Sequence, residues 1–193
     1  MEHIYLDYNA STPLAPEVVE AMRPFLTEDF GNPSSSHWAG KGAREAVETA
    51  RAEVAALVGA KPAEIIFTSG GSEANNHALK GIFFASRRRT PHIITTCIEH
   101  PAVLEPCKFL ERLGARVNRI PVDRAGLVDP DDVRRAITPD TILVSVMHAN
   151  NEVGTIEAIA SISQLTRERD IPFHTDAAQS AGKTPLEVNQ LGV

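Results

Sequence analysis

Four polar clusters in this sequence have the residue types needed to bind a small ligand, and each follows a short apolar run. They are Thr68–Glu73, Glu99–Pro101, Met147–Gly154 and His174–Gln179. In an open parallel sheet, ligands bind at the carboxyl ends of the strands. If the apolar runs are parallel strands, the four clusters therefore meet at one edge of a sheet.

The first cluster has two consecutive glycines before an expected helix. Glycines let the backbone approach an anion, and a helix N-terminus offers unpaired N–H groups with a favourable dipole. The hydroxyl of Ser72 adds one more donor. The pattern indicates a phosphate site at Gly71 and Ser72, and an ordinary tight turn between strand and helix is the alternative.

The other clusters contribute a ring, amides and a carboxylate. His100 is suited to the core, to a metal or to stacking on a flat ligand. Asn150 and Asn151 favour a turn, and their amides also suit recognition of a carboxylate or a ring hydroxyl. Asp176 follows a strand-like run, where a partly buried carboxylate needs a cationic partner. The alternative for Asp176 is an N-cap of the residues that follow.

Two other kinds of site fit the sequence poorly. The segment Gly182–Thr184 resembles the end of a P-loop, but Ala177 stands where that motif needs glycine and Pro185 follows at once. The possible metal ligands are His100, His148, His174 and Asp176. The sequence has neither the HExxH nor the CxxC spacing of common metal sites. We therefore predict neither nucleotide hydrolysis nor a metal site.

The elements that position these clusters alternate along the chain. Helical periodicity predicts helices over residues 16–22, 37–58, 72–86, 102–113, 130–137 and 159–169. Apolar β-branched runs predict strands over 4–6, 64–68, 93–96, 116–120, 141–146 and 172–175. Pro24 is expected to bend or end the first helix, and Gly59 to cap the second. This alternation is typical of an α/β fold with a mostly parallel sheet flanked by helices.

Composition limits the remaining functions. The 193 residues are 42% hydrophobic and 23% charged, as in an ordinary globular protein, and the net charge of −6 argues against nucleic-acid binding. No signal peptide and no apolar run long enough for a membrane span is visible, so we expect a cytoplasmic protein with no membrane partner. Cys97 and Cys107 are expected to be reduced, buried structural thiols.

Taken in order, these motifs resemble the cysteine desulfurases of the class V aminotransferase group. The resemblance spans essentially the whole chain and rests on Tyr5–Pro13, Gly31–Ser35, Thr68–Asn76, Glu99–His100, Met147–Gly154 and His174–Ser180. It implies the large domain of a fold type I transferase dependent on pyridoxal 5'-phosphate (PLP). The implied reaction converts L-cysteine to L-alanine and passes the sulfur through an enzyme persulfide. The implied partners are an acceptor such as an iron–sulfur scaffold protein, used in cluster or thio-cofactor synthesis, and a second copy in a homodimer.

The resemblance also implies a role in cofactor binding for six residues, one of which, Asn151, would contact the substrate as well. Gly71 and Ser72 would hold the phosphate of PLP. His100 would stack on the pyridine ring and help to move protons, which makes it the catalytic residue of this chain. Asp176 would pair with the ring nitrogen and keep it protonated. Gln179 would hydrogen-bond the ring hydroxyl.

Substrate contacts are implied at two places. Asn151 would lie beside the ring hydroxyl and the substrate carboxylate. Ala10 and Ser11 would line the substrate entrance, within an N-terminal segment 1–15 that we expect to associate with a smaller domain. Residues 16–193 would form part of the PLP-binding large domain.

Two features of the family have no match in this sequence. The Ser-x-His-Lys segment that carries the Schiff-base lysine is absent, and neither Cys97 nor Cys107 corresponds to the cysteine that forms the persulfide. We therefore expect an N-terminal portion that is inactive alone, without the Schiff-base lysine and the small domain. The alternatives are a selenocysteine lyase, which shares most of the motifs, and a non-catalytic binding or dimerisation fragment.

Overall fold

The computed structural model describes residues 3–193. The chain divides into two compact units, of which the first ends at Ile65 and the second begins at Ile66. The first unit holds two helices, α1 (Pro16–Thr27) and α2 (Lys41–Val58), with short 3₁₀ turns at Trp38–Gly40 and Pro62–Glu64. The second unit holds the sheet and all four polar clusters.

The helices of the first unit differ from the prediction at two points. Helix α1 continues past Pro24 to Thr27, because the carbonyl of Pro24 still accepts the N–H of Glu28 at 2.8 Å. The proline thus removes a donor without ending the helix. The second helix begins at Lys41 rather than residue 37, since the preceding residues form the 3₁₀ turn. It ends as predicted at Gly59, which is left-handed with φ 71°.

Two predicted strands, 4–6 and 64–68, are wrong. Neither segment pairs with a strand within residues 3–193. Ile66 and Phe67 remain 67% and 48% exposed, although their sequence is strand-like. A strand needs a neighbour that satisfies its backbone N–H and C=O groups, and local sequence does not supply one.

The sheet of the second unit has four strands, all parallel, in the order β2-β1-β3-β4. The strands are β1 (His92–Thr96), β2 (Arg116–Ile120), β3 (Thr141–Ser145) and β4 (Phe173–His174). The helices are α3 (Gly71–Ala85), α4 (Pro101–Arg112), α5 (Pro130–Ala136), α6 (Ile159–Arg167) and the unpredicted α7 (Val188–Leu191). The predicted α/β class is confirmed, with four of the six predicted strands in place.

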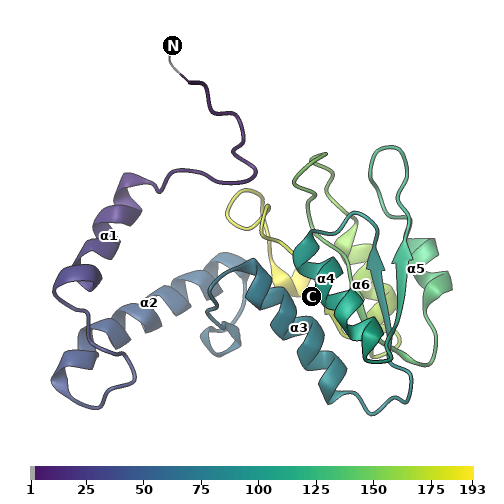
Figure 1. The fold of residues 1–193 in the computed structure, drawn as a ribbon, viewed down its shortest axis with the longest axis horizontal. Coiled ribbons are helices and arrows are strands. Elements are labelled where there is room, and N and C mark those ends of the chain that lie inside the picture. Colours follow the sequence, from purple (N-terminus) through teal and green to yellow (C-terminus); the bar gives the residue numbers. More distant parts are fainter. Residues whose placement is uncertain (1–2) are drawn as a thin grey trace. The chain divides into compact units, whose positions relative to one another are not determined.

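Side-chain alternation along the strands builds one apolar core on each face of the sheet. Ile93 of β1 and Leu143 of β3 are buried with residues of α3 and α4. The next residues along, Ile94 and Val144, are buried with residues of α5 and α6. The helices therefore form a layer on each side of the sheet (Figure 1). Right-handed crossovers require this arrangement, because β2 is added on one side of β1 and β3 on the other.

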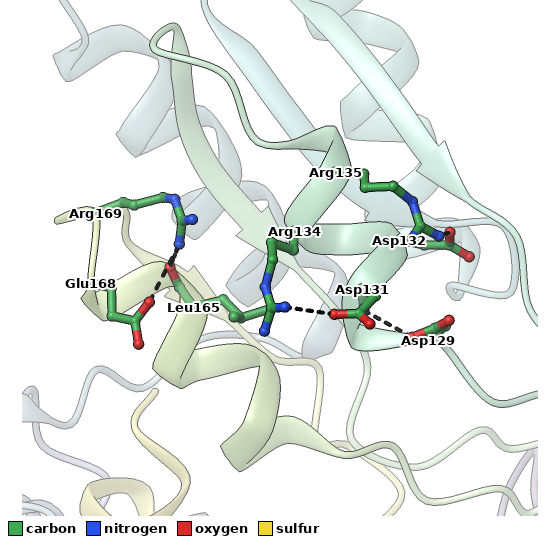
Figure 2. A network of polar contacts seen from close by, with 8 residues as sticks. All are labelled: Asp129, Asp131, Asp132, Arg134, Arg135, Leu165, Glu168 and Arg169. Atoms are coloured by element: carbon green, nitrogen blue, oxygen red, sulfur yellow. Dashed lines mark hydrogen bonds and ion pairs between the residues drawn. The ribbon is translucent and has the colours of Figure 1, made fainter.

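Helices α5 and α6 carry short-range polar contacts (Figure 2). The Asp129 carboxylate caps α5 by accepting the N–H of Asp131 at 2.8 Å, and Arg134 lies 2.9 Å from the Asp131 carboxylate. Arg169 donates to the Leu165 carbonyl at 2.9 Å. Exposed ion pairs of this kind contribute about 0–1 kcal/mol each, so these contacts fix helix ends and little more.

The two cysteines differ in their surroundings. Cys107 is buried in the core beside α3, as predicted, and both thiols are free. The prediction that Cys97 is buried is wrong, because it lies one residue past β1, where the chain leaves the sheet. Of the helices formed by residues 3–193, none combines the length and apolarity that a membrane span needs.

Candidate active site

A cavity of about 230 Å³ lies where the carboxyl ends of β1, β3 and β4 face the start of α3. This is the point where the strand order reverses, which is where open α/β sheets bind ligands. Six of the predicted site residues line it: Gly71, Ser72, His100, Asn151, Asp176 and Gln179. The remaining lining residues are Asn75, Ala102, Met147, Ala149 and Ala178.

The start of α3 forms one end of the cavity. Gly70 is the N-cap residue of α3 and has φ 157° and ψ 178°, a conformation essentially confined to glycine. Because glycine has no side chain, the start of the helix has no side-chain cap at this position. A Cβ added at Gly70 or Gly71 would meet nothing within 4 Å, so the space beside this backbone is open. Glu73 closes the turn from the other side by accepting the N–H and the hydroxyl of Ser69, each at 2.6 Å. These bonds lower the pKa of Glu73.

The ring of His100 has a fixed hydrogen-bond arrangement. Its Nδ1 accepts the N–H of Ala102 at 3.0 Å and so caps helix α4. Because an acceptor nitrogen carries no proton, the neutral ring holds its proton on Nε2. His100 therefore combines a structural contact at one nitrogen with an N–H donor at the other.

Asp176 has a donor at each carboxylate oxygen. Oδ2 accepts the side-chain amide of Asn75 at 2.8 Å, and Oδ1 accepts the N–H of Ala178 at 3.0 Å. The second bond is the capping contact that the sequence offered as an alternative, and it coexists with a place in the cavity wall. The two bonds hold both oxygens and so restrict rotation of the carboxylate.

The loop after β3 is organised by Asn150. This buried side chain accepts the N–H groups of Glu152 and Val153 at 2.9 and 3.0 Å and donates to the carbonyl of Ile98 at 3.0 Å. The last bond joins the loop to the turn after β1. The predicted turn is therefore present, and it presents Asn151 to the cavity.

A buried acid lies behind the cavity wall. Glu99 is 4% exposed, and its Oε1 accepts the hydroxyl of Thr96 at 3.0 Å and the N–H of Met147 at 2.8 Å. Its Oε2 is buried without a hydrogen-bond partner among residues 3–193. Burial raises the pKa of Glu99 to about 8. The group is thus a neutral acid near pH 7 that ties the end of β1 to the end of β3.

The histidines proposed as possible metal ligands have other partners. Nδ1 of His148 lies 2.8 Å from the Ser180 hydroxyl, and Nδ1 of His174 lies 2.8 Å from the Ser145 hydroxyl. Burial lowers the pKa of both rings. Within the described part of the chain, no three His, Cys, Asp or Glu residues are grouped as metal ligands.

Two predicted site residues lie in the first unit. The N–H groups of Ala10 and Ser11 both bond to the carbonyl of Asp7, and the Ser11 hydroxyl lies 2.9 Å from the Tyr5 hydroxyl. These contacts form a local turn. Their predicted place at a substrate entrance remains a prediction.

Three polar residues that organise the site make contacts that the sequence did not predict. Asn75 lies inside a predicted helix, where asparagine carries no positional signal, and Glu99 and Asn150 were noted only as parts of motifs. Each acts through a contact with a residue distant in sequence. For Asn75, the available signal was a polar residue at a position that helical periodicity assigns to the interior.

The aminotransferase class-V family model matches residues 4–193. The chain belongs to this family. A class-V relative, cysteine desulfurase IscS of Dictyoglomus turgidum, is 58% identical over 190 residues, which cover 98% of this chain and 48% of the relative. The structure titled "SspA in complex with cysteine" superposes with a TM-score of 0.95 at 43% identity, covering 98% of this chain and 55% of that one.

A second class-V structure, a NifS-like protein, has a TM-score of 0.92 at 40% identity and covers 96% of this chain and 51% of its own. The resemblance to cysteine desulfurases is therefore confirmed. The chain spans about half the length of the relatives it matches.

Proposed function

We propose that the protein containing these residues is a PLP-dependent cysteine desulfurase that transfers sulfur from L-cysteine. The observation that carries the proposal is the cavity, in which an open helix start, a histidine ring and a doubly hydrogen-bonded carboxylate line one space. The names of the relatives support the same reaction.

The residues present fit PLP. An uncapped helix start with no Cβ atoms beside Gly70 and Gly71 suits a phosphate. The Asp176 carboxylate, held by two hydrogen bonds, suits a protonated pyridine nitrogen. The volume of about 230 Å³ lies below the roughly 300–1,000 Å³ of pockets for drug-sized ligands and suits a smaller group. Bound PLP supplies an electron sink for bond breaking at the α-carbon of an amino acid.

Each wall residue then has one task. Gly71 and Ser72 would hold the phosphate. Gln179 would hydrogen-bond the ring hydroxyl, and Asn151 would lie beside that hydroxyl and the substrate carboxylate. Asp176 holds the proton on the ring nitrogen. His100 covers the ring face and offers its Nε2–H to the reacting groups, as its capped Nδ1 requires.

Several parts of the proposal concern the whole protein. The Schiff-base lysine and the persulfide cysteine are proposed to lie outside these 193 residues, as is the small domain with which residues 1–15 would associate. A sulfur-acceptor protein such as an iron–sulfur scaffold, a homodimer and a cytoplasmic location complete the proposal. They rest on the family resemblance alone.

The test is the substitution Asp176→Asn in protein expressed from its complete reading frame. An amide cannot hold the proton on the ring nitrogen, so release of alanine and sulfide from L-cysteine should fall by at least about 100-fold. Asp140→Asn makes the same change at an exposed position and should leave turnover unaltered.

Equal turnover by the Asp176→Asn variant would contradict the proposal, as would wild-type protein that fails to bind PLP. A preference for L-selenocysteine in the same assay would instead assign a selenocysteine lyase. PLP binding without turnover of either amino acid would favour the non-catalytic alternative.

A further inference from the structure

We propose that Asn75 is a positioning residue that orients the Asp176 carboxylate toward the ring nitrogen of PLP. The inference rests on the proposed function. Its basis is the 2.8 Å bond from the side-chain amide of Asn75 to Oδ2 of Asp176, which joins residues 101 positions apart. This contact links helix α3 to the segment after β4.

The position of Asn75 on α3 makes the link specific. Asn75 follows Ser72 by three residues, so the two side chains share one face of the helix. Both line the cavity, and Asn75 is only 4% exposed. The same helix face therefore carries the proposed phosphate contact and the donor to Asp176. Any rotation of α3 would move both together.

The chemistry of the pair favours a charged acceptor. Both donors to Asp176, the Asn75 amide and the N–H of Ala178, are uncharged, so neither neutralises the carboxylate. Bonds from neutral donors therefore leave the charge of the carboxylate available to a cationic ligand. An arginine or lysine at position 75 would compete with a pyridinium for the same charge.

Two substitutions of Asn75 separate the effect of its hydrogen bond from the effect of its packing. Asn75→Ala removes the amide and leaves a void, whereas Asn75→Leu removes the amide and keeps a similar volume. Asn76→Ala is the matched control, because the Asn76 amide bonds to the Ser72 carbonyl within α3 and does not line the cavity. All variants are made in protein expressed from its complete reading frame.

Two readouts are measured besides activity. The dissociation constant for PLP is obtained by titrating the apoprotein, and the protonation of the ring nitrogen is followed by ¹⁵N NMR of bound, ¹⁵N-labelled PLP across pH. Loss of a hydrogen bond to a charged group should weaken PLP binding by about 10-fold in both Asn75 variants. The ring nitrogen should also lose its proton at a lower pH than in wild type.

The outcomes are distinguishable. Wild-type affinity and an unchanged ¹⁵N titration in Asn75→Leu would overturn the inference and leave the proposed function standing. A defect in Asn75→Ala that Asn75→Leu restores would show that packing alone matters, which also overturns it. Failure of the wild-type protein to bind PLP would instead overturn the proposed function.

Discussion

Glu99 shows how burial sets the charge of a single residue near the site. Burial raises the pKa of its carboxyl, two hydrogen bonds to one oxygen lower it, and the charges of Asp176 and Glu157 raise it further. The neutral form is therefore favoured, and only Asp176 contributes negative charge to the cavity wall.

The folded protein should lose stability as pH rises through the range in which Glu99 titrates. Its pKa is raised from 4.5 to about 8, so the stabilisation is full below about pH 4.5 and disappears by about pH 8. The difference is at most about 5 kcal/mol. Glu99→Gln keeps the acceptor oxygen and the neutral charge, and so should remove this pH dependence when urea unfolding is measured from pH 5 to 8.5. A variant less stable than wild type at pH 8.5 would show that the ionised form is the stabilising one.

Residues of the site were predictable where their type implied a charge or a turn. Ser72, His100, Asp176 and Gln179 line the cavity as the four clusters suggested. The supporting amide at position 75 was not predictable, because its partner lies 101 residues away and only the assembled sheet brings them together.

At the scale of elements, helix α4 depends on the residue that also faces the cavity. His100 is an unusual N-cap, since its ring nitrogen replaces the oxygen of Ser, Thr, Asp or Asn. The same side chain therefore serves both the helix and the proposed cofactor.

Substitution of His100 should separate these two roles. Asn at this position can cap α4 but has no ring. His100→Asn should therefore have a free energy of unfolding close to that of wild type but should lose turnover. His100→Ala should lose turnover and also about 1 kcal/mol of stability. Equal destabilisation of the two variants in urea would show that the Nδ1 contact does not stabilise the helix.

The two central strands were predicted well. The runs at β1 and β3 were located to within a residue, because apolar β-branched sequences buried on both faces have a strong signal. Segment 64–68 has the same composition and forms no strand, since pairing depends on a neighbour that no local pattern encodes. Pro24 likewise interrupted the predicted helix but not the real one, because a single missing donor is tolerated.

At the scale of the whole molecule, the two units differ in how much they bury. No residue of α1 is buried, and Val18, Met22 and Leu26 are 45%, 45% and 73% exposed. Each face of the sheet in the second unit, by contrast, is covered by fully buried side chains. Local stability follows buried apolar contacts, so it should be distributed unevenly along the chain.

Hydrogen exchange should show this difference in a protein of these 193 residues. Amides of α1 should exchange at nearly the rate of an unstructured peptide, whereas those of β1 and β3 should be protected to the limit of global unfolding. Helix α4, which buries five residues, serves as the internal control for a packed helix. Protection of α1 equal to that of α4 would contradict the assignment of a weakly held first unit.

The bond between Asn75 and Asp176 also orders events in time. Closing a loop of 101 residues costs on the order of 4 kcal/mol in chain entropy, so the cavity is completed only when β4 has joined the sheet. A cofactor that contacts both α3 and Asp176 therefore binds the nascent protein late, after the crossover through α6 has formed. Mutations that destabilise α6 should first lower the fraction of protein with bound PLP, before they unfold the protein. Added PLP should restore this fraction by mass action.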